Sequence, residues 1–133
     1  LHSERNPSPT EPTHLLQIWI QPRERGLTPG YGDWDLAGIP VVDGKTLLIS
    51  GDGRDGSARI AQDAEVYRVQ LPAGGTATHE LRAGRGAWLQ VTRGQLTWNG
   101  TPLAAGDGAS SEQAGPIRLA AEAPAEALLF DLR

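Results

Sequence analysis

Cysteine and methionine are both absent from the 133 residues of this chain, and aromatic residues make up only 5% of it. Without cysteine, the chain has no disulfide framework, no thiolate ligand for a metal and no cysteine nucleophile. No apolar run reaches the roughly 20 residues that a membrane-spanning helix requires. A glycine-rich phosphate loop and the signature of a serine hydrolase are also missing, so neither nucleotide binding nor serine hydrolysis finds support.

Methionine is missing even from the first position, where Leu1 stands. An initiator methionine is normally removed only when the next residue is small, and leucine is not small. We therefore expect the chain to be a piece of a longer protein. The lack of a visible signal peptide decides nothing about such a piece.

The charge of the chain is modest and acidic, at −4 with histidine neutral. Nucleic acids and anionic membranes favour basic surfaces, whereas the arginines here are spread among acidic residues. We therefore expect no nucleic-acid partner and no membrane partner. The lack of cysteine is compatible with a cytoplasmic location, which we take as the expectation.

Glycine and proline are abundant, with 17 and 10 residues, and both interrupt helices and mark turns. From residue 58 on, short alternating segments are separated by such turns, which predicts an all-β sandwich or barrel. Asn99-Gly100 is a strong hairpin signal because both residues tolerate a positive φ. The predicted strands of this region are 58–63, 64–71, 76–81, 87–92, 95–99, 101–103, 117–120 and 125–132.

The part of the chain before residue 58 is less regular. Residues 1–14 are polar and rich in proline, which denies them regular ladder bonding, so we expect an extended strap. Residues 15–20 alternate and predict one strand, and residues 45–50 predict another. The glycine-rich segment 51–57 lacks the alternating oxygen ligands and the closing glutamate of a calcium loop, so we interpret it as a turn.

Several motifs follow a spacing that is known from one protein family. Pro72-Ala73-Gly74 followed by His79, then residues 88–94 and 103–108, resemble the two motifs of a cupin barrel. Three earlier segments are more specific, because together they resemble a pirin-like bicupin. They are residues 1–7, 14–20 and 50–57.

The resemblance implies a fold and a domain organisation. Residues 45–133 would form an all-β cupin barrel, a jelly roll, as the second of two tandem cupin domains. Residues 1–44 would be a strap and the last strand of the N-terminal cupin domain, which is then the natural partner of this chain. In the family, that first domain holds one metal, usually iron, through three histidines and one glutamate. The resemblance places the last histidine at His2 and the glutamate at Glu4.

Two functions follow from the resemblance for the parent protein. Bacterial members are associated with quercetin 2,3-dioxygenase activity, which implies a flavonol-like small molecule as substrate. Animal pirin is a redox-responsive transcription co-regulator, so the alternative is a redox- or metal-responsive binding protein without turnover. In either case we expect this chain to be inactive alone.

The residues of the His2 and Glu4 pair support half of a metal site. Side chains two apart in a strand point to one face, and an imidazole with a carboxylate suits a transition metal. The competing interpretation is an exposed, frayed terminus. Because a stable non-haem iron site needs at least three protein ligands, we expect iron or another divalent transition metal in the parent and none in this chain.

His79 is the candidate for a second metal site, and we interpret it as a partly exposed histidine of a strand or turn. A metal-binding cupin motif has two histidines separated by one residue and a glutamate a few positions on. Here Leu81 occupies the second histidine position, and Glu80 directly follows His79. One histidine does not make such a site.

The other notable side chains have ordinary interpretations beside functional ones. His14 is either a strand-edge residue or a support of the parent's metal site. Trp88 and Trp98 are expected in the core or barrel wall, while Trp19 and Trp34 are expected to cover the junction with the first domain.

A severed strand offers an edge for pairing with another chain. We therefore expect residues 1–40 to lie on the barrel, to be disordered, or to pair or swap in a homodimer.

Overall fold

The computed structural model describes residues 3–133 and consists of strands joined by turns. Within that range, helical structure is limited to the short 3-10 turn η1 (Arg54–Gly56). The first strands are β1 (Val41–Val42), β2 (Lys45–Ser50), β3 (Ala58–Arg59), β4 (Ala64–Leu71) and β5 (Thr76–Leu81). The others are β6 (Gly86–Arg93), β7 (Gln95–Trp98), β8 (Thr101–Ala104), β9 (Gly108–Ser111), β10 (Gly115–Ala120) and β11 (Ala125–Leu132).

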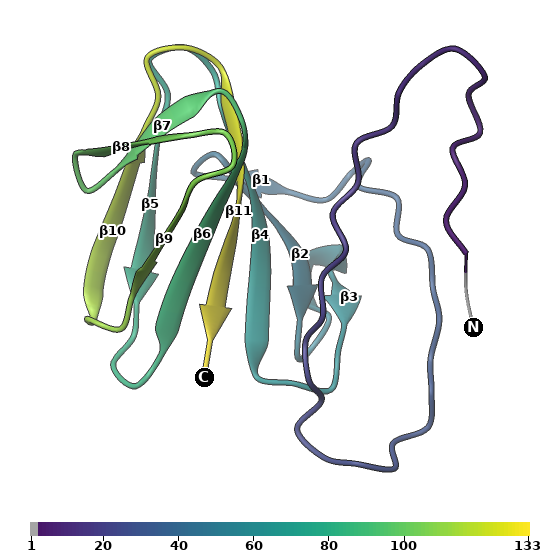
Figure 1. Cartoon of the computed structure of the whole chain (residues 1–133). Coiled ribbons are helices and arrows are strands. Elements are labelled where there is room, and N and C mark those ends of the chain that lie inside the picture. The colour runs from purple at the N-terminus through teal and green to yellow at the C-terminus, as the bar shows by residue number, and fades with distance from the viewer. Residues whose placement is uncertain (1–2) are drawn as a thin grey trace.

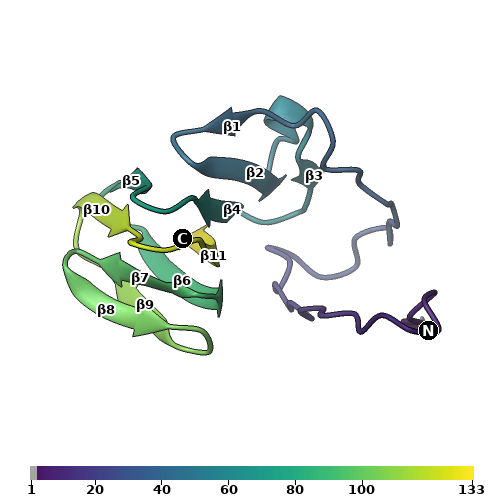
Figure 2. The same cartoon turned by 90° about the horizontal axis from the view of Figure 1, so that it is seen from above.

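The strands form two sheets, as Figures 1 and 2 show from two directions. The larger sheet has the order β1-β2-β4-β11-β6-β9, with β3 added in parallel to β2, and the smaller has the order β5-β10-β7-β8. All other pairings are antiparallel. The all-β jelly-roll barrel expected from the sequence is confirmed, and it consists of two sheets.

The core lies between the two sheets and follows from the period of two along each strand. In β5, every second side chain is buried, and the same holds for the first part of β6. Leu89 and Val91 of the larger sheet pack with Ile117 and Leu119 of the smaller one in a single cluster. Alternation therefore places one face of each sheet in the core.

Two tight turns confirm the predicted use of glycine. Asn99 and Gly100 have φ of 49° and 86° and join β7 to β8, as the Asn-Gly signal predicted. Gly94 has φ of 70°, and a Cβ there would lie 2.4 Å from the carbonyl oxygen of Pro124. Only glycine fits that close approach between the turn after β6 and the start of β11.

Two side chains of the β1–β2 hairpin connect the larger sheet to the edge strand β5 of the smaller sheet, where no backbone ladder joins the sheets. The backbone N–H of Thr78, on the edge strand β5, donates to Oδ2 of Asp43 at 2.7 Å. Nζ of Lys45 donates to the carbonyl oxygen of the same Thr78. The β1–β2 hairpin therefore satisfies both backbone groups of one β5 residue and closes the barrel at this side. We call this pair of contacts the Thr78 clasp.

Residues 3–40 correct one prediction. The strand predicted at residues 15–20 is wrong for this structure, which has no strand there. Figures 1 and 2 show the segment running outside the barrel, on the outer side of the larger sheet. It is tethered at Arg23, whose N–H donates to the carbonyl of Ala61, and at Gln21, whose carbonyl accepts from Gln62. An alternating pattern needs a neighbouring strand to become a ladder, and this segment has none beside it.

Smaller differences concern strand lengths. The strand predicted over 58–63 is limited to Ala58–Arg59, after which the chain bends into β4. The short strand Gly108–Ser111 was not predicted, because its small residues carry no apolar alternation. The segment 51–57 is a turn containing η1, as expected. In residues 3–133, we find no helix long and apolar enough to cross a membrane.

Candidate functional site

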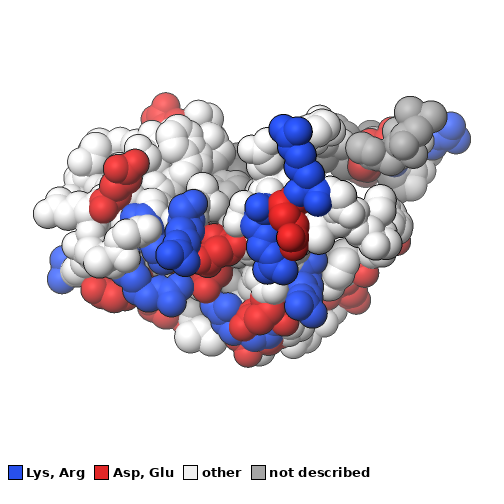
Figure 3. Space-filling model, turned by 90° about the horizontal axis from the view of Figure 1, so that it is seen from below, with Lys and Arg blue, Asp and Glu red and all other residues white. Residues whose placement is uncertain are grey.

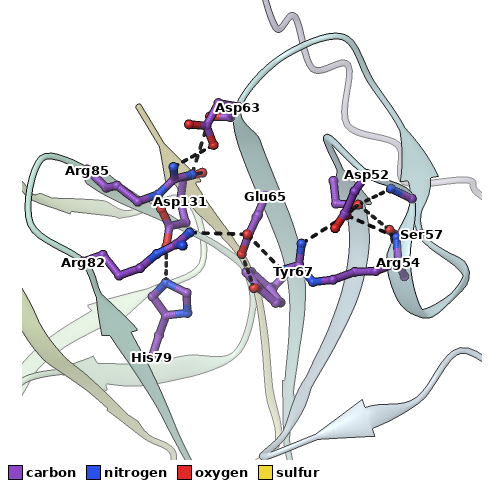
Figure 4. A network of polar contacts seen from close by, with 12 residues as sticks. Asp52, Arg54, Ser57, Asp63, Glu65, Tyr67, His79, Arg82, Arg85 and Asp131 are labelled. Atoms are coloured by element: carbon purple, nitrogen blue, oxygen red, sulfur yellow. Dashed lines mark hydrogen bonds and ion pairs between the residues drawn. The ribbon is translucent and has the colours of Figure 1, made fainter.

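A buried group of charged side chains lies at one end of the barrel (Figure 4). His79 occupies an inward position of β5, and Asp131 an inward position of β11. Arg85 lies in the turn between β5 and β6. Their exposed fractions are 7%, 1% and 8%. Charged groups buried to this degree must be paired, and the structure pairs all three.

Asp131 is the centre of this group. Its Oδ2 lies 2.7 Å from Nε2 of His79, and its Oδ1 accepts a hydrogen bond from Nε of Arg85. The guanidinium also donates to the carbonyl oxygen of Asp131 at 3.0 Å. Both carboxylate oxygens are therefore occupied by donors from two different elements.

The guanidinium of Arg85 has a second set of acceptors at Asp63, just before β4. Nη1 donates to Oδ1 of Asp63 at 2.7 Å, and Nη2 reaches the carbonyl oxygen of Asp63 at 3.5 Å. Four oxygen atoms of two aspartates thus surround one guanidinium. Three strand ends, those of β4, β6 and β11, are fixed to one another by this cation.

These contacts set the pKa values of the group. Burial alone would raise the pKa of Asp131, but hydrogen bonds from His79 and Arg85, together with their charge, hold it below its usual range. The hydrogen bond from Arg85 likewise lowers the pKa of Asp63. Burial would lower the pKa of Arg85, but its two aspartate partners raise it. The ionised forms of Asp131, Asp63 and Arg85 are therefore favoured.

A more exposed chain of contacts continues from this group across the barrel end. The ring of Tyr67 meets that of His79 edge-on, with centroids 5.3 Å apart. Its hydroxyl donates to Glu65, which also accepts from Nη2 of Arg54 at 2.9 Å. Burial and the hydrogen bond to Glu65 raise the pKa of Tyr67, so the phenol stays protonated. Arg54 in turn reaches Asp52 at 3.2 Å.

A charged cleft of about 600 Å³ opens on this side of the molecule. Figure 3 shows basic and acidic side chains interleaved on this face. The charged residues that line the cleft are Arg23, Asp52, Arg54, Asp63, Glu65, Arg82 and Arg133. Arg54, Arg82 and Arg133 are paired with the cleft's own Glu65 and Asp63, and Arg23 is paired with Glu24 beside it. The charges that line the cleft therefore largely offset one another.

The described residues do not fit a metal centre. Within 3–133, no three His, Cys, Asp or Glu side chains come together in a group that could hold a metal ion. His79 binds Asp131 instead, and Leu81 is buried in the apolar core. The expectation that His79 is partly exposed is wrong, because the period of two points it into the barrel.

The predicted metal ligands lie at the start of the chain. His2 is outside the described residues. Glu4 lies on the extended leading segment and lines a hollow of about 380 Å³ together with residues 15–18. That position is outside the barrel, so the structure does not bring Glu4 together with His79.

His14 and Trp88 meet at a different place, an apolar groove on the outer face of the larger sheet. The groove has a volume of about 500 Å³ and lies between strap residues 14–18 and strands β6 and β11. Trp88 is 43% exposed there, and its ring lies against Gly108, where a Cβ would be 2.5 Å from the indole. Trp98 is buried in the core, as expected. His14 is exposed and belongs to no strand, so it is not a strand-edge residue.

Sequence reasoning missed Arg85, Asp131 and Asp63. One signal was available for Asp131. It continues the inward series Ala125, Ala127 and Leu129 of β11, so a carboxylate at this position had to be buried. A buried carboxylate needs a cationic partner, but nothing in the sequence identifies Arg85 among 11 arginines.

Comparison with known proteins identifies the family of this chain. Residues 47–132 match the model of the quercetinase C-terminal cupin domain. A quercetin 2,3-dioxygenase of Escherichia coli (strain K12) is 43% identical over 131 residues, which are 98% of this chain and 55% of that protein. A pirin-like protein of Caulobacter vibrioides is 37% identical over 134 residues, covering 98% of this chain and 56% of the relative.

Solved structures give the same relationship. The bacterial pirin YhhW from Escherichia coli, solved in complex with nickel(II), has a TM-score of 0.77 and 38% identity. The match covers 86% of this chain and 48% of that one. The chain therefore spans about half the length of the curated relatives that it matches.

Proposed function

Since this chain belongs to the pirin-like cupin family and contains its C-terminal cupin domain, we propose that it is part of a longer, metal-dependent dioxygenase acting on quercetin-like flavonols. The observation that carries the proposal is the 43% identity, over nearly the whole chain, to a quercetin 2,3-dioxygenase. The match to about half of that relative supports the existence of a further domain.

In this proposal the barrel of residues 45–133 is a structural partner and the metal centre belongs to the preceding domain. His2 and Glu4 would supply two of its ligands. Residues 3–133 hold no group of three ligand side chains, which supports a site whose remaining ligands come from the preceding domain. Glu4 lies on the leading segment, outside the barrel, beside residues 15–18.

The surface of the leading segment supports a preceding domain as its partner. Eleven large hydrophobic side chains are exposed in the described part of the chain, and eight of them lie within residues 15–36. They are Leu15, Leu16, Ile18, Trp19, Leu27, Tyr31, Trp34 and Leu36. So dense an apolar segment is typical of a surface that another domain covers. We propose that the N-terminal cupin domain is that cover, and a strap-swapped homodimer is the alternative outcome.

Turnover by the whole protein tests the enzyme proposal. The iron- or nickel-loaded full-length protein should consume quercetin and dioxygen, and Glu4→Gln and His2→Ala should each abolish turnover. Glu11→Gln, which removes an exposed carboxylate of the leading segment outside the proposed ligand set, is the matched control and should retain it. Turnover no higher than that of free metal would reject the dioxygenase.

Metal analysis of the present chain tests whether the metal site is divided between this chain and the preceding domain. We expect no stoichiometric iron in the isolated chain, because it supplies at most two of the ligands that such a site needs. About one equivalent of metal, lost on His2→Ala, would contradict this and indicate a site rebuilt across two copies.

A second candidate is a redox- or metal-responsive binding protein without turnover. The observation in its favour is that the Caulobacter vibrioides relative is described only as a pirin-like protein. A metal-loaded full-length protein that changes its oligomeric state or partner binding with the metal's oxidation state, without consuming quercetin, would support it. The cytoplasmic location expected from the sequence stays a prediction.

A further inference from the structure

The environment of the Arg85 guanidinium resembles the ligand shell of a cation. Two carboxylate oxygens and two carbonyl oxygens of Asp63 and Asp131 accept hydrogen bonds from it. The imidazole of His79 holds the other oxygen of the Asp131 carboxylate. Carboxylates and an imidazole are the groups by which proteins also bind divalent metals.

The position of Arg85 in the sequence also relates it to a metal site. His79 stands at the first histidine of a cupin metal motif, and Leu81 replaces the second. Arg85 follows Leu81 by four residues. In the motif that this segment resembles, a glutamate stands a few positions after the second histidine. In this barrel, Arg85 therefore brings a positive charge to the part of the motif that otherwise carries the negatively charged glutamate ligand. The guanidinium supplies the positive charge that a bound metal ion would supply.

We propose that the guanidinium of Arg85 takes the place of a metal ion in this barrel, as a built-in cation that links Asp131 to Asp63, while His79 holds the other oxygen of Asp131. Arginine suits this role because it is always charged and its planar fork matches carboxylates. The cation fixes the ends of β4, β6 and β11, and it keeps metals out. This inference does not rest on the dioxygenase proposal, since it concerns only residues of the present chain.

The proposal can be tested by removing the Arg85 side chain and supplying a guanidinium from solution. Arg85→Ala removes the guanidinium from the buried Asp131 carboxylate, which then keeps only His79, and from the half-exposed Asp63. We therefore expect the melting temperature to fall by about 10 °C. Methylguanidinium at about 10 mM should restore about 5 °C of this loss and leave the wild type unchanged. The matched control is Arg93→Ala, which removes an exposed arginine and should change neither value.

Two outcomes of this experiment would overturn the proposal. One is an Arg85→Ala protein as stable as Arg93→Ala, which would mean that the cation links nothing. The other is a folded, destabilised Arg85→Ala protein that methylguanidinium does not stabilise more than the wild type. If Arg85→Ala does not fold, Arg85→Gln, which retains part of the hydrogen bonding, takes its place in the same assay.

A variant that restores the metal-binding motif tests whether the Arg85 guanidinium occupies the position of a metal ion. The double variant Leu81→His/Arg85→Glu restores the two-histidine and glutamate pattern around His79. Equilibrium dialysis against Ni²⁺ should find about one equivalent bound to this variant and none to the wild type. Adding His79→Ala should remove the bound nickel.

Each result of the nickel experiment has a definite meaning. A folded double variant that takes up no more nickel than the wild type would overturn the proposed equivalence of guanidinium and metal. Nickel bound stoichiometrically by the wild type and lost on His79→Ala would overturn it as well. If the double variant folds neither with nor without Ni²⁺, the methylguanidinium experiment decides.

Discussion

Nε2 of His79 lies 2.7 Å from Oδ2 of Asp131, and this contact joins the two sheets through the barrel interior. His79 belongs to β5 at the edge of the smaller sheet, whereas Asp131 belongs to β11 inside the larger one. No backbone ladder joins these two strands. A polar contact therefore does, at this end of the barrel, what apolar packing does elsewhere in the core.

Stability is expected to depend on pH through Asp131. Its pKa is lower in the folded chain than the ordinary value of about 3.9. The stabilisation is therefore complete above the unfolded pKa and is lost as the pH falls through the folded pKa. Asp131→Asn should lower the free energy of unfolding by about 3 kcal/mol at pH 7 and make its decline below pH 4 shallower. Urea unfolding at several pH values measures both, and an unchanged pH dependence would contradict the assignment.

Removal of the imidazole should cost less than removal of the carboxylate. His79→Ala leaves Asp131 still paired with Arg85, so we expect a loss of about 1–3 kcal/mol in the free energy of unfolding. His79→Gln keeps a donor on a side chain of comparable length and should recover part of it. His14→Ala, on the exposed strap, should change stability by less than about 0.5 kcal/mol. Equal effects of the two alanine variants in chemical denaturation would contradict a structural role for His79.

The barrel could be predicted because its signals are local. Alternation in β4, β5 and β11 and the Asn99-Gly100 turn each fix a strand or a reversal within a few residues. The strand predicted at 15–20 carried an equally clear pattern and still failed. Alternation predicts which side chains would lie on each face of a strand. A strand also needs a neighbouring strand for its backbone hydrogen bonds, and residues far away in the sequence decide whether one is present.

The buried charged group could not be predicted for the same reason. Asp131 and His79 are 52 positions apart, and Arg85 and Asp131 are 46 positions apart. Their meeting depends on which strand ends share one end of the barrel. The family resemblance pointed to His2 and Glu4 and to a metal. The place of Arg85 after the degenerate motif at His79 gains meaning only through its contacts with Asp63 and Asp131 in the structure.

The Thr78 clasp should contribute to the stability of the β5 edge. Burial lowers the pKa of Lys45, and the charge of Asp43 offsets this in part. Lys45→Met keeps the apolar stem but removes the donor, and we expect a loss of about 1 kcal/mol. Asp43 has a positive φ of 49°, so Asp43→Asn, which tolerates this conformation, is the mild control and Asp43→Ala the severe variant. Hydrogen exchange of the Thr78 amide should accelerate in Asp43→Ala, and unchanged protection would show that the clasp is dispensable.

Tryptophan fluorescence can show whether the strap has a partner. Trp19 is 87% exposed and Trp98 8% exposed, so acrylamide should quench Trp19 strongly and Trp98 weakly in the isolated chain. Trp19→Phe should therefore remove the most quenchable part of the emission, whereas Trp98→Phe should remove a protected part and destabilise the core. In the full-length protein the emission of Trp19 should become protected, because the preceding domain covers the strap. Equal quenching of Trp19 in both forms would contradict that cover. Protection that appears in the isolated chain only at high concentration would show that a second copy covers the strap instead.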